Sequence, residues 1–208
     1  MEKVNSPLIE WGVASRSLRG QEKCGDLSLV KLSSEEALVA VVDGVGHGEA
    51  AAEVAQMAIE CLGAGNGEPL AVKLRHCHEA LRRTRGVAAS LASFRASDNM
   101  MSWLGVGNVE GVLVRARSFE GRVGLALRGG LVGDHLPSLA PHSLRISKGD
   151  VLIFATDGVQ PGFRENADLI GRPQQIAERI LARHNLGTDD ALVLAVRYIY
   201  GKDQGPFR

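Results

Sequence analysis

The chain has 208 residues, and its 24 basic residues balance its 24 acidic ones, so its formal charge is zero. Apolar residues make up 45% and charged residues 23%, which is typical of a globular protein and excludes wholesale disorder. The balanced charge argues against a nucleic-acid binder, which needs clustered Lys and Arg. No apolar run approaches the roughly 20 residues that span a bilayer, and the N-terminus lacks a signal-peptide pattern. We expect a cytoplasmic protein without membrane contact, a single domain over residues 1–208 with a short flexible tail from about 201.

The first half of the chain predicts three strands followed by two helices. Strand-like patterns cover residues 8–18 and 27–32, and the continuous apolar run 37–42 predicts a strand that is buried on both faces. Apolar residues at helical spacing predict a helix over 49–62. A glycine-rich break then leads to a proline that can open a second helix, which we expect over 69–85.

The second half of the chain is predicted to be mainly strands. A period of two returns after Gly86 and predicts successive antiparallel strands joined by short turns, over 87–94, 101–109, 112–117 and 123–127. An irregular segment, a buried strand, a helix and a final strand follow, over 131–148, 151–156, 173–184 and 191–200. This order indicates an α+β fold with antiparallel sheets rather than repeating βαβ units.

Five aspartates share an unusual setting at the ends of predicted strands. Asp43 and Asp157 each follow an apolar strand and precede a glycine, Asp189 and Asp190 precede the last strand, and Asp26 opens an early one. For any one of them alone, a place in a turn or a helix cap is the more common role. Together they could project into one cleft, where they would repel each other and have raised pKa values unless a cation lay among them. Oxygen ligands of this kind suit Mg²⁺ or Mn²⁺.

The motifs around these aspartates resemble a known family. They are GD at 25–26, VVDGVGHG at 41–48, GVGNVEG at 105–111, FATDGV at 154–159 and DDALVLAV at 189–196. The set resembles the metal-dependent Ser/Thr protein phosphatases (PPM family), in particular their SpoIIE-like branch and the stand-alone RsbX-type stressosome phosphatases. The resemblance implies two stacked antiparallel β-sheets flanked by helices. It also implies hydrolysis of phosphoserine or phosphothreonine on bacterial stress-signalling proteins (stressosome, STAS-domain). The attacking water would be activated by two metal ions, Mn²⁺ or Mg²⁺.

The resemblance also implies a role for each matching residue. Asp43 matches the carboxylate that bridges both ions, and the Gly44 carbonyl matches a ligand of the second ion. Asp157 and Asp189 match the remaining direct carboxylate ligands of the first ion. Asp26 matches an acid near the ions that often acts through water. Asp43 and Asp157 would thus be the catalytic pair that holds the nucleophilic water.

The sequence departs from the wider family at the expected general acid. Eukaryotic-type relatives carry a His two residues after the bridging Asp, where this chain has Val45, and His47 lies further on. Asp190 matches a position of Asn or Asp in relatives and is taken as a supporting residue only. No clear phosphate-binding arginine stands out, since Arg16 and Arg19 are merely nearby in the chain.

Two weaker hypotheses compete with a protein phosphatase. A catalytically silent module of the same fold could dock a partner, and a small-molecule phosphoester hydrolase could use the same carboxylates. His76, Cys77 and His78 do not point to one side of a helix, so we expect an exposed helix face rather than a metal site. The partner we expect is a phosphorylated protein, bound by a monomer, with no nucleic acid involved.

Overall fold

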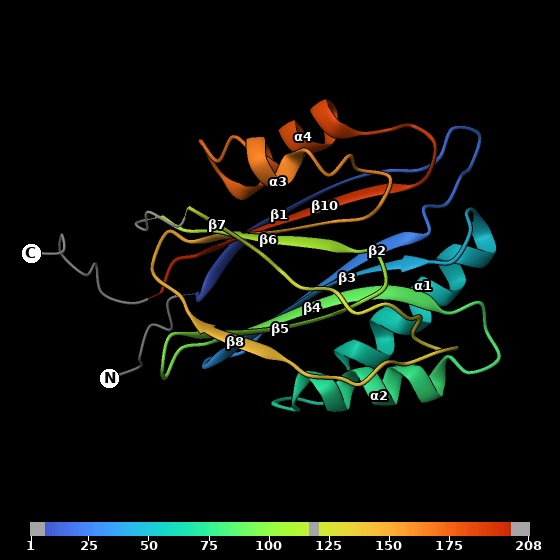
Figure 1. The fold of residues 1–208 in the computed structure, drawn as a ribbon, viewed down its shortest axis with the longest axis horizontal. Coiled ribbons are helices and arrows are strands. Elements are labelled where there is room, and N and C mark those ends of the chain that lie inside the picture. The colour runs from blue at the N-terminus through green and yellow to red at the C-terminus, as the bar shows by residue number, and fades with distance from the viewer. Residues whose placement is uncertain (1–6, 117–120, 201–208) are drawn as a thin grey trace, which may run out of the picture.

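The computed structural model describes residues 7–116 and 121–200, which form four layers (Figure 1). Two five-stranded antiparallel sheets lie face to face in the middle. Helices α1 and α2 cover the outer face of one sheet, and α3 and α4 cover the outer face of the other. The expected α+β architecture of two stacked sheets flanked by helices is therefore confirmed. The predicted tail from about 201 lies outside the described residues.

The first sheet contains both the N-terminal and the C-terminal strand of the described chain. Its order is β1-β10-β9-β6-β7, and every neighbouring pair is antiparallel. The strands are β1 (Ile9–Arg16), β10 (Ala191–Tyr198), β9 (Val151–Ala155), β6 (Glu110–Val114) and β7 (Arg122–Gly124).

The second sheet is built from strands that are mostly consecutive in the chain. Its order is β2-β3-β4-β5-β8, again antiparallel throughout. The strands are β2 (Asp26–Leu32), β3 (Glu36–Gly44), β4 (Val87–Arg95), β5 (Met100–Val106) and β8 (His142–Arg145). Because β5 belongs to this sheet and β6 to the other, the prediction that the strands at 101–109 and 112–117 pair with each other is wrong.

The helices follow the predicted pattern with two differences. They are α1 (Glu49–Gly63), α2 (Leu70–Ala80), α3 (Phe163–Asn166) and α4 (Pro173–His184). Helix α2 stops five residues earlier than predicted, because Arg83 takes a positive φ of 72° and the chain turns there. The single turn α3 was not predicted. In the described part of the chain, no helix is both long and apolar enough to cross a membrane.

Helix α2 is covered on two sides, which corrects the prediction of an exposed face at 76–78. Only His76 is exposed there. Cys77 is fully buried, and its thiol faces the Ala58 carbonyl of α1. His78 is buried and accepts a hydrogen bond from the Gly133 N–H at 3.0 Å. Both α1 and the segment after β7 therefore pack on this helix.

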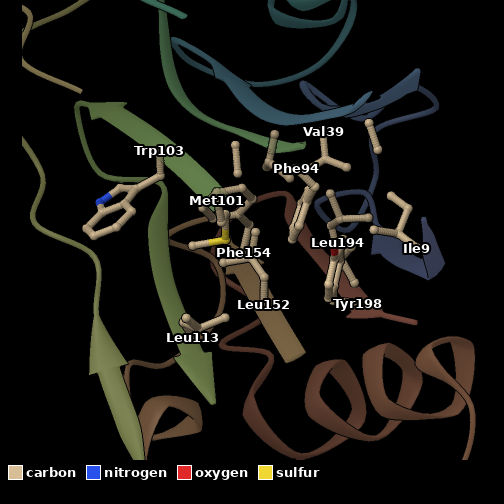
Figure 2. Packing of buried hydrophobic residues seen from close by; sticks show 14 of the residues in the cluster. Ile9, Val39, Phe94, Met101, Trp103, Leu113, Leu152, Phe154, Leu194 and Tyr198 are labelled. Atoms are coloured by element: carbon tan, nitrogen blue, oxygen red, sulfur yellow. The ribbon is translucent and has the colours of Figure 1, made fainter. Parts of the chain in front are cut away.

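The main hydrophobic core lies between the two sheets (Figure 2). Phe94 of the second sheet stacks on Tyr198 of the first, with ring centroids 6.2 Å apart. Other residues of this cluster are Val39, Met101, Leu152, Phe154 and Leu194. Each fully buried side chain of this size contributes about 1.5–3 kcal/mol. This layer holds the two sheets together and so fixes their strand ends relative to each other.

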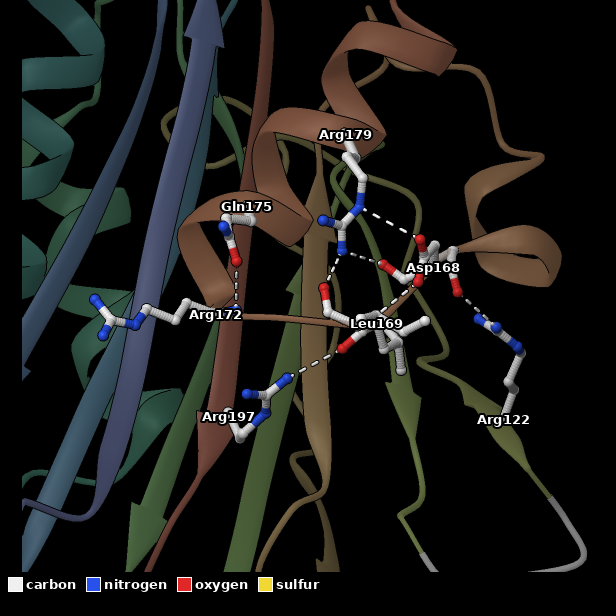
Figure 3. A network of polar contacts seen from close by, with 9 residues as sticks. Arg122, Asp168, Leu169, Arg172, Gln175, Arg179 and Arg197 are labelled. Atoms are coloured by element: carbon white, nitrogen blue, oxygen red, sulfur yellow. Dashed lines mark hydrogen bonds and ion pairs between the residues drawn. The ribbon is translucent and has the colours of Figure 1, made fainter.

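Arginine side chains donate hydrogen bonds to backbone carbonyls of the connection between β9 and α4 (Figure 3). Arg122 donates to the carbonyls of residues 164 and 167, Arg179 to those of 168 and 170, and Arg197 to that of 169. Guanidinium groups offer five N–H donors in a rigid fork, so three of them can satisfy this stretch of carbonyls. The connection is thereby fixed without regular secondary structure over most of its length.

Candidate active site

Two of the predicted aspartates face each other across β2 and β3. Asp26 begins β2, Asp43 lies near the end of β3, and the two are direct partners in the antiparallel register. Directly opposed residues point to the same face, with Cβ atoms about 4.5–5.5 Å apart. Asp26 is 2% exposed and Asp43 is partly buried. The second sheet thus contributes two neighbouring carboxylates.

The first sheet brings the other three aspartates to the same edge. Asp157 follows β9, and Asp189 and Asp190 precede β10, which pairs antiparallel with β9. A cavity of about 420 Å³ opens between the sheets at this edge, and Asp43, Asp157 and Asp189 line it. Asp26 and Asp190 are buried beside these three rather than in the cavity wall. All five predicted carboxylates therefore gather in one region.

The negative charges of these aspartates are not paired with a Lys or Arg side chain of the described residues. Burial, followed by the charge of Asp43, raises the pKa of Asp26 to about 8. Burial, followed by the charges of Asp157 and Asp189, raises the pKa of Asp43 to about 7. Burial and Asp189 also raise the pKa of Asp157. Within residues 7–116 and 121–200, neither Lys nor Arg forms an ion pair with any of these groups.

The chemistry of this donor set fits a hard divalent cation, because the charged groups that line the cavity are all carboxylates. The carboxylates are not gathered as a finished site, however. Among the described residues, no three His, Cys, Asp or Glu side chains are placed so that they could hold a metal ion as they stand. Like charges repel, so the side chains would have to converge when a cation binds.

Hydrogen bonds fix the two buried aspartates. Thr156 donates its hydroxyl to Asp26 at 2.7 Å and accepts the Leu192 N–H at 2.8 Å. Asp190 accepts the N–H groups of Leu18 and Gly25, both at 2.7 Å. Asp190 therefore ties the connection between β1 and β2 to the start of β10. The supporting role of Asp190 stays a prediction.

The glycine after each strand-end aspartate allows another backbone to approach closely. A Cβ atom on Gly44 would meet the Ala51 carbonyl oxygen well inside 3.0 Å, and one on Gly158 would meet the Asp190 carbonyl oxygen equally closely. Helix α1 therefore packs directly on the end of β3, and the start of β10 packs directly on the turn after β9. The Asp-Gly pairs are a packing requirement of the site.

Asn108 is a site residue that was not singled out from the sequence. Asn108 lines the cavity and donates its amide N–H to Asp157 Oδ2 at 2.7 Å. Asp43 lines the same cavity, and the Asn108 amide partly offsets the rise in the pKa of Asp43 that burial causes. Asn after Gly is typical of a turn, so the residue type alone gave no reason to select it. Only its place in the GVGNVEG motif pointed to this edge.

Of the residues considered for the general acid and for phosphate binding, only the one at position 45 lines the cavity. Val45 lines the cavity where a general acid was sought, and its carbonyl accepts a hydrogen bond from Arg85 at 3.3 Å. His47, Arg16 and Arg19 are exposed and do not line the cavity. Residues 129–131 also line the cavity, and the sequence predicts them only in or next to an irregular segment.

Comparison with known proteins identifies the family of the chain. The family model described as Stage II sporulation protein E (SpoIIE) matches residues 33–199. The chain belongs to this family. The resemblance inferred from the motifs is therefore confirmed, and the matched range contains every predicted site residue except Asp26.

Individual relatives agree with the family assignment. The phosphoserine phosphatase RsbX of Bacillus subtilis (strain 168) is 28% identical over 140 residues, 67% of this chain and 69% of that protein. A second relative is a solved structure from work on the bacterial stressosome, described there as a modular system adapted to control secondary messenger signalling. It is 27% identical to this chain with a TM-score of 0.83, and the match covers 91% of this chain and 99% of that one. A crystal structure of RsbX in complex with magnesium has a TM-score of 0.82 at 22% identity over 93% and 96%, which shows the shared fold.

Proposed function

We propose that the protein is a phosphoserine/phosphothreonine protein phosphatase that depends on Mn²⁺ or Mg²⁺, with two ions at the site. The observation that carries the proposal is the gathering of five uncompensated aspartates beside one cavity of about 420 Å³. Membership of the SpoIIE family and the similarity to a phosphoserine phosphatase support it.

The chain's own residues would divide the work at this edge. Asp43, Asp157, Asp189 and the Gly44 carbonyl would hold the ions, and Asp26 would contribute from its buried position beside Asp43. Bound ions would supply a nucleophilic water and neutralise charge that develops on the phosphoryl group.

The open side of the site suits a phosphoryl group carried by a protein. Ala88 and the glycines at 107, 129 and 130 leave room in the cavity wall, so a phosphorylated side chain can reach the aspartates. Val45 is 42% exposed at the cavity and offers an apolar surface to the substrate backbone.

The substrate we propose is a phosphorylated stressosome or STAS-domain protein in the bacterial cytoplasm, bound by a monomeric enzyme. The proposal draws on the relatives, one named a phosphoserine phosphatase and another taken from work on the stressosome.

A phosphate-release assay tests the function. The protein is mixed with a serine-phosphorylated STAS-domain protein, with Mn²⁺ and then with an excess of chelator. We expect release that the chelator abolishes and that Asp43→Asn and Asp157→Asn each reduce by at least about 100-fold, because Asn keeps the size and loses the charge. Absence of release together with absence of Mn²⁺ binding would favour a silent binding module. Release from small phosphate esters alone would favour a small-molecule hydrolase.

A further inference from the structure

The connection between β5 and β6 crosses from one sheet to the other beside the cavity. Gly107 and Asn108 form this crossing, and both neighbouring stretches are fixed. The Gly107 N–H donates to the Arg128 carbonyl at 2.9 Å, and buried Ser90 donates its hydroxyl to the Val109 carbonyl at 2.6 Å. The backbone that carries the Asn108 side chain is therefore held on both sides.

The Asn108 amide contacts one of the predicted metal ligands directly. Asp157, which follows β9 in the first sheet, accepts the amide N–H at 2.7 Å. Asp43, near the end of β3 in the second sheet, lines the same cavity as these two residues. Hydrogen bonds to ionised acceptors are roughly twice as strong as neutral ones.

The Asp157 carboxylate lies among like charges that favour its turning away. The charge of Asp189 raises the pKa of Asp157, the charge of Asp157 raises the pKa of Asp43, and within the described chain no Lys or Arg ion pair offsets this charge. A fixed donor such as the Asn108 amide limits this movement of Asp157, so a cation that binds has less reorientation to impose. Groups that orient metal ligands typically affect metal affinity by about 10- to 100-fold.

We propose that Asn108 is a positioning residue that fixes the orientation of the Asp157 carboxylate for a divalent cation. The inference rests on the proposed function, in that it takes Asp157 as a metal ligand. It assigns to Asn108 an effect on ion binding, distinct from a simple tie between the two sheets.

Calorimetric titration of the full chain with Mn²⁺ tests this role. Asn108→Ala removes the donor to Asp157, and we expect the Mn²⁺ affinity of this variant to fall about 10- to 100-fold. Asn108→Gln keeps both donors on a longer side chain and should recover part of the affinity. Asn66→Ala, an exposed asparagine outside the cavity, is the matched control and should bind like the wild type.

The variants are expected to fold, because Asn108 is exposed and does not have a positive φ, so alanine creates neither a buried void nor strain. Circular dichroism and urea unfolding check this directly. A purely structural tie would lower the free energy of unfolding and leave Mn²⁺ affinity unchanged, which would overturn the inference. Equal affinities of the Ala and Gln variants would also overturn it. Failure of the wild-type protein to bind Mn²⁺ would refute the proposed function and the inference with it.

Discussion

Gly158→Ala is expected to disrupt the site through packing alone. Gly158 is the glycine of the Asp-Gly pair after β9, and it adds no chemical group to the cavity. A Cβ atom at this position would lie 2.9 Å from the Asp190 carbonyl carbon and 3.0 Å from the Ala191 Cβ, with the Asp190 carbonyl oxygen closer still. The substitution therefore pushes the turn carrying Asp157 away from the start of β10.

The size of the effect follows from these distances. Ordinary van der Waals contact begins at about 3.4 Å, and the obstacles are backbone atoms that cannot rotate away. To reach that distance at the carbonyl oxygen, the turn and the strand must separate by more than 1 Å. Over-packing of this kind costs about 1–3 kcal/mol of stability. A misplacement of about 1 Å can cost about 100-fold in rate. We expect both losses.

Urea unfolding, Mn²⁺ titration and phosphate release measure the three consequences. Gly124→Ala is the control, because a Cβ atom on Gly124 would have open space for 4 Å around it and the residue does not have a positive φ. It should retain the stability and activity of the wild type. Wild-type stability and activity in Gly158→Ala would refute the argument that close packing of this turn on Asp190 positions the carboxylates.

Three further predictions concern stability. Because the pKa values of Asp26 and Asp43 are raised to about 8 and about 7, the folded chain binds more protons than the unfolded one above the ordinary pKa of 3.8. With chelator present, the free energy of unfolding should therefore fall from about pH 4 to pH 8 in urea titrations, and Asp26→Asn should flatten that slope. Asp150→Ala leaves the Arg115 guanidinium without its 2.9 Å partner and should cost about 3–5 kcal/mol by urea unfolding, with Mn²⁺ affinity unchanged because the pair lies at the other end of β9. Lys73→Met removes a buried ammonium that donates to carbonyls at the end of α1 and should lower the unfolding free energy by about 1.5–3 kcal/mol.

Hydrophobic periodicity was sufficient where an element has a buried face of its own. It placed α4 to the residue and set β3 and β9 within two residues of their ends. It missed β8 because the strand's side chains are mostly exposed, and pairing with β5 rather than an apolar pattern makes it a strand. It also could not show that β5 and β6 separate into different sheets, since both have the same period.

The part of the candidate site that could be predicted is the part marked by charge and by position at the end of a strand. The five aspartates stand at strand ends in the sequence, and the strand ends meet. Asn108 and Thr156 were not singled out, because a polar residue in a turn or at a strand end is common and acquires a role only through its neighbours. The cavity wall at 129–131 comes from a connection without periodicity, so only the fold brings it there.

The pairing register of β2 and β3 makes the position of Asp26 depend on a turn far from the site. Asp26 faces Asp43 because the pairing register of β2 and β3 is continuous from one end of the hairpin to the other. At the far end the turn closes through hydrogen bonds between Ser33 and Glu36. A slip of one residue would turn Asp26 to the other face of the sheet. The length of a surface turn at the far end of the strands thus sets the alignment of the carboxylates, and a single-residue insertion there should be far more damaging to the enzyme than its exposed position suggests.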